Sequence, residues 1–375
     1  MQKLIHAIFL VTGTSIGAGL IALPMTVVNL GTVSFGIMIA IMVWLAYQSS
    51  CMTAQLNVAH KTPASIVELS RQYGGKVLFA VTLSSFYLLF FGLLTVYFSC
   101  MADTMTTCSP IGKTPSIILC GCGLFLFLNL KTRLFSDLNS VFVVILLAVI
   151  AVAVISIRYI PETVAENVPF RAYEWIKAVP ILFTSFGIQG SCAYFCFYLR
   201  NDLKRLKLSF CIGLLIPAVI YLVWTMCCLK TAAVCDGTFY QRLQAHKVPV
   251  GELIRFLCES SSLPTMGVFL KLLTLFAVLT STIGVAAGLL QPLQAFLPKT
   301  VAKGVLCFVP VLINLTVAEA FLKVLSFGGM MLAILSILVP YKLLKPMGMQ
   351  KNPLHRLCFI GGLVVVICEL WSVLC

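Results

Sequence analysis

The sequence predicts an all-α integral membrane protein with eleven transmembrane helices. Of its 375 residues, 60% are apolar and only 10% are charged, and the mean hydropathy is +1.05. A soluble domain carries about 25% charged residues and cannot hide this much apolar surface. The low charge and the 26 Phe also exclude a disordered chain. We therefore expect helices long enough to cross a bilayer of about 30 Å.

Eleven apolar segments define the expected transmembrane helices. They are residues 4–30, 33–57, 77–101, 115–130, 138–157, 177–199, 208–229, 265–290, 301–318, 321–340 and 355–374. With the N-terminus in the cytoplasm and the sides alternating, 16 of the 26 Lys and Arg fall in inner segments, beside three acidic residues. Because basic residues favour the cytoplasmic face, this asymmetry predicts a cytoplasmic N-terminus and a periplasmic C-terminus. It also explains the net charge of +14 without a nucleic-acid partner.

Two of the expected helices contain clusters of glycine. The first runs Gly13-Thr14-Ser15-Ile16-Gly17-Ala18-Gly19, and the sixth runs Ser185-Phe186-Gly187-Ile188-Gln189-Gly190-Ser191. Each Gly costs a helix about 1 kcal/mol relative to Ala, so unwinding is favoured there. Alone, the first cluster also fits a small-residue packing face. The second cluster at the corresponding place favours a pair of broken helices, which is typical of a transporter's central site.

The spacing of these features predicts an inverted repeat. The two interrupted helices are five spans apart, as are the two long loops that follow the second and the seventh spans, and an odd offset inverts the orientation in the membrane. We expect a first repeat over residues 1–157 (helices 1–5), a second over residues 158–340 (helices 6–10), and an eleventh helix over residues 341–375.

At these two motifs the sequence resembles the hydroxy/aromatic amino acid permeases of bacteria, above all the tyrosine- and tryptophan-specific members. The first motif is followed by Ala22-Leu23-Pro24, and the sixth span carries Phe183-Thr184-Ser185-Phe186-Gly187. Two further stretches agree, Asn201-Asp202-Leu203-Lys204-Arg205-Leu206 and Thr280-Ser281 leading to Gly284-Val285-Ala286-Ala287-Gly288-Leu289. The match runs in order over nearly the whole chain.

The resemblance implies eleven spans and the five-plus-five inverted-repeat fold of the amino acid–polyamine–cation superfamily, which is the LeuT-type fold. It also implies a symporter that imports tyrosine or tryptophan across the bacterial inner membrane by alternating access. One residue departs from the family pattern: Gln189 stands where the sixth-span motif has His. Because Gln does not titrate, a role of this position in proton coupling is in doubt.

Substrate binding is assigned to the two interruptions. We expect the substrate carboxylate to bind N–H groups around Thr14, Ser15, Gly17, Ala18 and Gly19. The amino group would bind carbonyls of Phe186, Gly187 and Gln189, and the glycines of this segment, Gly190 included, would leave room for an aromatic ring. Tyr87 and Phe91 lie four residues apart on the third span and are candidates to stack on the substrate, although helix packing is the commoner role of such a pair.

The coupling ion, H⁺ or Na⁺, stays open. In the eighth span, Ala277-x-x-Thr280-Ser281 resembles the pattern of sodium-coupled relatives, in which one carbonyl and two hydroxyls bind the ion, completed by the backbone of Gly13 and Ile16. Such hydroxyls often bond only their own helix. Charged residues in the spans, including Lys177, Lys271, Lys323 and Glu369, are expected near the ends of helices, where they reach the interface.

Other functions fit less well. A membrane enzyme would need nucleophiles, metal ligands or paired acids, and a channel would need a continuous polar pore. The expected partners are the aromatic amino acid and the lipid bilayer, and we expect no cofactor, no nucleic acid and no obligatory protein partner. Serine is the alternative substrate. Most of the 16 Cys lie inside spans, and a disulfide among Cys100, Cys108, Cys235 and Cys258 stays open.

Overall fold

The computed structural model describes residues 2–17, 19–62, 64–108, 110–129, 148, 171–260, 266–294, 296–316, 321–350 and 352–374. Its helices are α1 (Gln2–Ser15), α2 (Gly19–Val27), α3 (Thr32–His60), α4 (Ile66–Tyr73), α5 (Gly75–Cys108), α6 (Lys113–Phe127), α8 (Ala172–Ser185), α9 (Cys192–Tyr198), α10 (Leu203–Cys235), α11 (Gly237–Gln244), α12 (Val250–Glu259), α13 (Met266–Gln294), α14 (Lys299–Thr316), α15 (Phe321–Ala333), α16 (Val339–Leu344) and α17 (Pro353–Leu374). The described part of the chain is therefore helical, as predicted, and contains no strand.

Six of these helices, together with the continuous run from α15 to α16 (Phe321–Leu344), make seven segments that are long and apolar enough to cross a membrane. The bent pair α1 and α2 brings the number to eight. Helices occupy every expected span except the fifth, residues 138–157, which lies outside the described residues apart from residue 148. The expected sixth span is divided into α8, a 3₁₀ turn (Gln189–Ser191) and α9. The tenth contains a π-helical turn, Ile334–Leu338, between α15 and α16.

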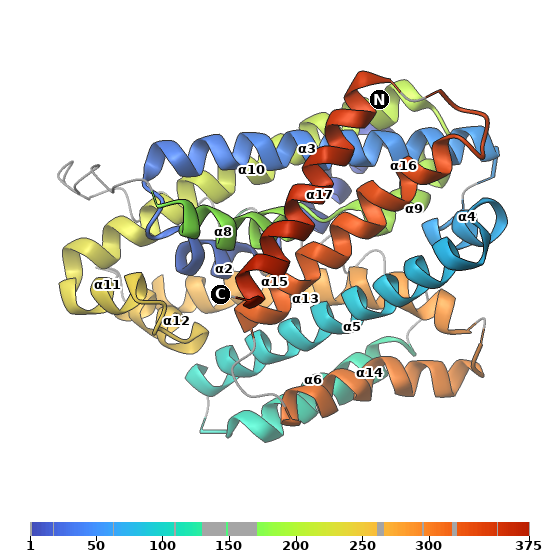
Figure 1. Ribbon diagram of the computed structural model, residues 1–375. Helices are drawn as coiled ribbons and strands as arrows, with labels where there is room; N and C mark the ends of the chain where they lie inside the picture. Colours follow the sequence, from blue (N-terminus) through green and yellow to red (C-terminus); the bar gives the residue numbers. More distant parts are fainter. Residues whose placement is uncertain are drawn as a thin grey trace.

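The long helices run roughly side by side around the two broken ones (Figure 1). α3 and α10 pack against each other on one side, and α5 packs with α6 and α14 on the other. Between these groups, α1 contacts α10, and α2 contacts α8. The side chains of Ile16, Leu20, Phe183 and Phe186 from the broken helices are fully or almost fully buried. The broken helices therefore form the centre of the molecule.

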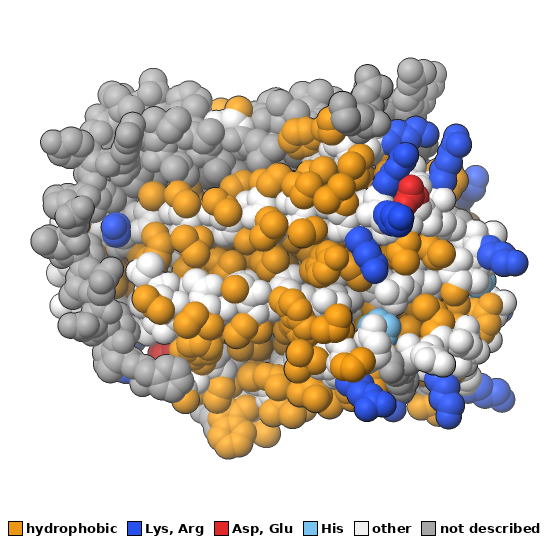
Figure 2. All heavy atoms as spheres, turned by 90° about the horizontal axis from the view of Figure 1, so that it is seen from above, with side chains coloured by type: hydrophobic (Ala, Val, Ile, Leu, Met, Phe, Trp, Pro, Cys, Tyr) orange, Lys and Arg blue, Asp and Glu red, His pale blue; other side chains and the backbone are white. Residues whose placement is uncertain are grey.

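The surface agrees with a membrane environment. In Figure 2 a broad hydrophobic band covers the middle of the molecule, and Lys and Arg side chains gather at one end. Comparison with Figure 1 places this basic end at the side of α4 and the N-terminus. Phe197, Val219, Leu312 and Trp371 are among the large apolar side chains that are more than half exposed. Exposed apolar groups of this size on long helices are expected to face lipid.

At the basic end, polar residues fix the turns. Arg200 and Asn201 adopt positive φ angles of 53° and 57° between α9 and α10. The Asn201 amide donates to the Lys61 carbonyl at 3.0 Å, and Asp202 caps α10 by accepting from two backbone N–H groups. The motif Asn201-Asp202 thus holds the turn after the broken helix against the loop that follows α3.

Candidate functional site

The first break separates α1 from α2. α1 ends at Ser15, α2 begins at Gly19, and their axes differ by 51°. The Ile16 N–H still bonds the Thr12 carbonyl at 3.0 Å, and the Leu20 N–H bonds the Gly17 carbonyl at 3.1 Å. The break is therefore short. It lies within the glycine cluster of the first span, as predicted.

Hydroxyl groups surround this first break. The Ser281 hydroxyl, on α13, lies 3.2 Å from the Ile16 carbonyl. A Cβ on Gly17 would collide with the Ser281 hydroxyl. The Ser15 hydroxyl is buried and has no hydrogen-bond partner. Because a buried hydroxyl without a partner costs about 1–3 kcal/mol, Ser15 is well suited to bind a polar ligand group.

Some of the oxygens that were predicted to bind a cation lie close to one another. The Ser281 hydroxyl is 3.0 Å from the Ala277 carbonyl as well as 3.2 Å from the Ile16 carbonyl. The Thr280 hydroxyl lies 3.0 Å from the same Ala277 carbonyl. Gly13, the fifth predicted residue, lies inside α1. Four of the five residues therefore share one neighbourhood between the first break and α13.

The second break, between α8 and α9, is longer and has apolar neighbours. α8 ends at Ser185, and the chain continues through Phe186 and Gly187 into the 3₁₀ turn at Gln189. Phe186 is completely buried, and its ring lies 5.5 Å from that of Tyr221 in an edge-to-face arrangement. A Cβ on Gly187 would lie 3.1 Å from the Leu332 side chain. Aromatic and aliphatic groups therefore enclose this segment.

Tyr221, on α10, joins the two breaks. Its hydroxyl lies 2.7 Å from the Ser15 carbonyl and 3.1 Å from the Ser185 carbonyl, which are the last residues of α1 and α8. Gly19 lies at the same point, since a Cβ there would be 2.7 Å from the Ser185 hydroxyl and 2.8 Å from the Tyr221 hydroxyl. The two interrupted helices therefore meet at their breaks, around one phenol group.

One aromatic ring fills a gap between two glycines. A Cβ on Gly190 or on Gly288 would lie 2.8 Å from the ring of Phe90, which is on α5. Phe86 stacks on Phe90 with a centroid distance of 4.3 Å and an interplanar angle of 23°. Sequence reasoning missed Phe90. The absence of side chains at Gly190 and Gly288 therefore lets the edge of the Phe90 ring approach both backbones.

The remaining predicted residues are placed as follows. The rings of Tyr87 and Phe91 stack with a centroid distance of 6.3 Å. Both side chains are partly buried against the apolar core, on a face of α5 next to the one that carries Phe90. Thr14 lies in α1, where its hydroxyl donates to the Leu10 carbonyl at 2.6 Å. Ala18 and the side chain of Gln189 lie outside the described residues. The substrate roles of all these residues stay predictions.

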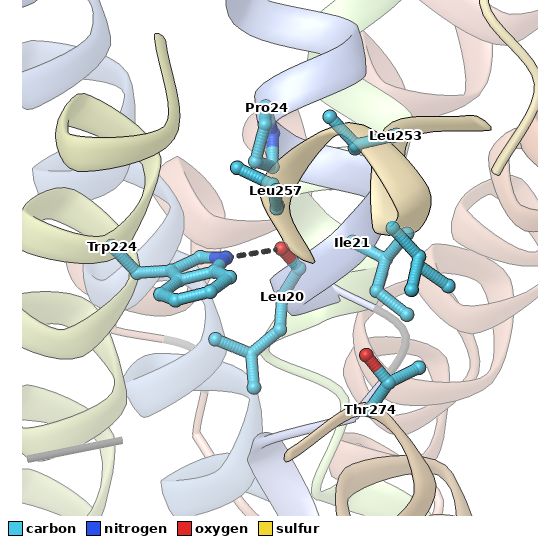
Figure 3. A pocket seen from close by; sticks show the side chains of 8 residues that line it. Leu20, Ile21, Pro24, Trp224, Leu253, Leu257 and Thr274 are labelled. Atoms are coloured by element: carbon cyan, nitrogen blue, oxygen red, sulfur yellow. Dashed lines mark hydrogen bonds between the residues drawn. The ribbon is translucent and has the colours of Figure 1, made fainter. Parts of the chain in front are cut away.

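On the side of α12 the site is covered. A cavity of about 20 Å³ is lined by Leu20, Ile21, Pro24, Trp224, Leu253, Ile254, Leu257 and Thr274, which come from α2, α10, α12 and α13 (Figure 3). The Trp224 indole N–H donates to the Leu20 carbonyl at 2.7 Å. A cavity this small holds a water molecule, whereas small-molecule sites measure about 300 Å³ or more. α12 therefore closes this side of α2 to an amino acid.

A polar cluster supports the same closure. The Glu174 carboxyl, in the first turn of α8, lies 3.2 Å from His246 Nε2 and accepts a hydrogen bond of 3.2 Å from Asn29, which follows α2. Asn29 also donates to the Gln244 carbonyl at 2.9 Å. These contacts tie the loop after α11 to the ends of α2 and α8 that lie away from the breaks.

Neither a metal cluster nor a disulfide is found in the described part of the chain. No group of three His, Cys, Asp or Glu is suited to a metal ion there. Among the described cysteines, Cys100, Cys235 and Cys258 form no disulfide. The side chain of Cys108 lies outside the described residues.

Curated relatives that align over most of their own length are named as amino acid transporters. Tyrosine-specific transport system 1 of Haemophilus influenzae is 26% identical over 92% of this chain and 88% of its own length. Glutamine transporter 2 of Aliivibrio fischeri is 25% identical over 90% and 87%. The tryptophan-specific transport protein of H. influenzae is 22% identical over 96% and 91%.

The fold is also found among solved structures. The crystal structure of a mutant of the Eremococcus coleocola manganese transporter superposes with a TM-score of 0.57, covering 98% of this chain and 85% of that one, at 12% identity. This likeness concerns the fold alone. The match to a family, by contrast, covers residues 1–373. The chain is a multi-pass membrane protein that belongs to the tryptophan/tyrosine permease family.

Proposed function

We propose that this protein is a symporter that imports tyrosine, tryptophan or both across the bacterial inner membrane by alternating access, driven by a proton or sodium gradient. The main support is that the breaks of α1–α2 and α8–α9 meet at Tyr221 and Gly19. Interrupted helices that meet inside a bundle present free backbone groups to a polar ligand. The tyrosine- and tryptophan-specific relatives support the substrate class.

The substrate carboxylate binds at the first break. The donors we propose are the N–H groups of Gly17, Ala18 and Gly19, because the positive end of the α2 dipole favours a negative charge there. The Ser15 hydroxyl, which is buried and unpartnered, adds a donor from the preceding helix. Thr14 supplies backbone at the end of α1.

The amino group and the ring bind at the second break. Carbonyls of Phe186, Gly187 and Gln189 accept from the ammonium group. The ring enters the space between Gly190 and Gly288 that the Phe90 ring fills in this conformation. The tyrosine- and tryptophan-specific relatives support an aromatic substrate over serine. Tyr87 and Phe91 remain candidates to line the approach of the ring.

We propose that the coupling ion is either sodium or a proton. The oxygens of Ile16, Ala277, Thr280 and Ser281 suit a monovalent hard cation, which supports sodium. Gly13 would complete that set with its carbonyl. Proton coupling needs an acidic group that changes its environment during transport.

The membrane arrangement extends this proposal. We place the N-terminus in the cytoplasm because the basic end of the surface lies beside it, and the C-terminus in the periplasm. Residues 1–157 and 158–340 form the two inverted repeats, and residues 341–375 add the eleventh helix. α1 with α2 and α8 with α9 then move against the other helices to open the site on each side in turn.

The test is uptake into proteoliposomes. Labelled tyrosine, tryptophan, serine and glutamine are offered separately under an inward proton or sodium gradient. We expect accumulation of an aromatic substrate under one gradient, abolished by an ionophore. Preference for serine or glutamine would replace the substrate assignment, and no accumulation of any of the four would contradict the function.

A matched pair of variants connects uptake to the site. Gly17→Leu places a large side chain against Ser281 and is expected to abolish uptake. Gly123→Leu, on an exposed position of α6 with open space around it, is expected to leave uptake unchanged. Undiminished uptake by Gly17→Leu at normal membrane expression would contradict the placement of the site.

A further inference from the structure

Glu369, near the end of α17, is a buried acid. Glu369 is only 3% exposed, whereas Leu374, five residues further along the same helix, is 84% exposed. The sequence leads us to expect that Glu369 reaches the membrane interface, and this expectation is wrong. The helix turns the side chain toward α15 instead. An ionisable residue buried within a membrane-spanning helix is rare and is associated with function.

The partners of the Glu369 carboxyl are neutral hydroxyls. Ser326, on α15, donates a short hydrogen bond to Oε2. The Ser372 hydroxyl lies 3.4 Å from the same oxygen and 2.9 Å from the Glu369 carbonyl. None of the ion pairs in the described part of the chain includes Glu369.

Among the described residues, the helices that contact α17 form no ion pair with Glu369. On α8 the Lys177 ammonium lies 4.1 Å from the centroid of the Tyr173 ring. On α15 Lys323 is exposed, one turn before Ser326. The outer half of α3 (residues 32–45) and the π-helical turn have no ionisable side chains, and the only one beside Glu369 on α17 is the thiol of Cys368. A carboxylate buried without a cation costs several kcal/mol, and a bound proton removes that cost.

The Glu369 site is connected to the second break. Leu325, the neighbour of Ser326, accepts a hydrogen bond of 3.1 Å from the hydroxyl of Thr184, which is the penultimate residue of α8. Gly329 lets α15 touch α8, because a Cβ there would collide with the Pro180 carbonyl and lie 2.7 Å from the Thr184 hydroxyl. A movement of α8 against α15 therefore changes the surroundings of Ser326 and, through it, of Glu369.

We propose that Glu369 binds the co-transported proton, an inference that rests on the symport function proposed above. The carboxylate takes up one proton from the outer solution and becomes a neutral acid, which then forms the buried hydrogen bond with Ser326. When α8 moves and the contact opens, the acid releases the same proton. Because the proton and the position of α8 affect each other reciprocally, the proton gradient favours one direction of transport.

Glu369→Gln tests this proposal, because Gln keeps the hydrogen bond to Ser326 but cannot release a proton. Two assays are run in proteoliposomes: exchange of labelled for unlabelled substrate without a gradient, and accumulation driven by a proton gradient with a pH dye inside. We expect exchange within about two-fold of wild type, and accumulation and proton influx reduced about ten-fold or more, as for loss of a coupling of 1–3 kcal/mol. The exchange rate should also lose its dependence on pH.

Ser326→Ala is the matched control, since it removes the partner but keeps the carboxyl. It is expected to keep proton-driven accumulation, with a shifted pH dependence. Proton-driven accumulation by Glu369→Gln at the wild-type level would overturn the proposal, and so would equal losses of exchange and accumulation in both variants.

Two further measurements keep the proposal decidable. If Glu369→Gln does not fold, Glu369→Asp, which still titrates, is expected to accumulate substrate with an altered pH profile, and an unaltered profile contradicts the proposal. In wild type, substrate influx that carries sodium but no protons overturns the Glu369 assignment alone. If the wild-type protein shows neither exchange nor accumulation, that result contradicts the symport function itself.

Discussion

The two broken helices use the same local device in opposite surroundings. The first break, between Ser15 and Gly19, has the Ser281 hydroxyl as a close neighbour and shares the Tyr221 hydroxyl with the second break. The second, between Ser185 and the 3₁₀ turn, contacts the ring of Phe90 and the side chain of Leu332. The comparison teaches that glycine opens the helix in both places, whereas the neighbouring helices decide which part of a ligand each opening can bind.

The largest effect is expected where the two breaks touch. Gly19→Ala places a methyl group within 2.7–2.8 Å of Ser185 and Tyr221. Overpacking of this kind costs about 1–3 kcal/mol. We expect uptake to fall about ten-fold or more, since 1.4 kcal/mol corresponds to a factor of ten. Uptake per correctly inserted molecule and thermal unfolding in detergent measure this.

Gly123→Ala provides the control for that change, because a Cβ there meets open space. It is expected to leave both quantities unchanged. If Gly19→Ala transports as well as Gly123→Ala, the breaks do not meet as described.

An intermediate effect is expected at the second break. Gly190→Ala pushes a methyl group against the Phe90 ring, and Phe90→Ala in the same chain removes the obstacle. We expect the double variant to regain uptake relative to Gly190→Ala, with a coupling energy of about 0.5–3 kcal/mol. The Phe90→Ala change should also alter the ratio of tyrosine to tryptophan uptake.

The same rescue should fail at the first break. Gly17→Ala collides with Ser281 and not with Phe90, so adding Phe90→Ala is expected to leave its defect unchanged. Rescue of both glycine variants by Phe90→Ala would mean that the two breaks share one environment.

The smallest effect is expected for Tyr221→Phe. The substitution removes one hydroxyl from between the Ser15 and Ser185 carbonyls and retains the ring against Phe186. A hydrogen bond of this kind contributes about 0.5–1.5 kcal/mol, so the unfolding temperature and uptake should both decrease moderately. A loss as large as that of Gly19→Ala would show that the phenol takes part in transport directly.

The sequence by itself determined the helical class, the positions of most spans and the two interruptions. These follow from local properties: apolar length decides which segments can cross a bilayer, and clustered glycine decides where a helix unwinds. The stretch that begins at Asn201 was recognised by its resemblance to the permease family, and the structure shows that it forms a turn and a helix cap.

Only the tertiary structure decided which side chains meet the breaks. Tyr87 and Phe91 have the same four-residue spacing as Phe86 and Phe90, and the rotation of α5 against Gly190 and Gly288 selects Phe90. Glu369 gives the same lesson, because its depth depends on how α17 leans on α15. Spacing along one helix fixes which residues share a face, but the direction of that face is set by packing between helices.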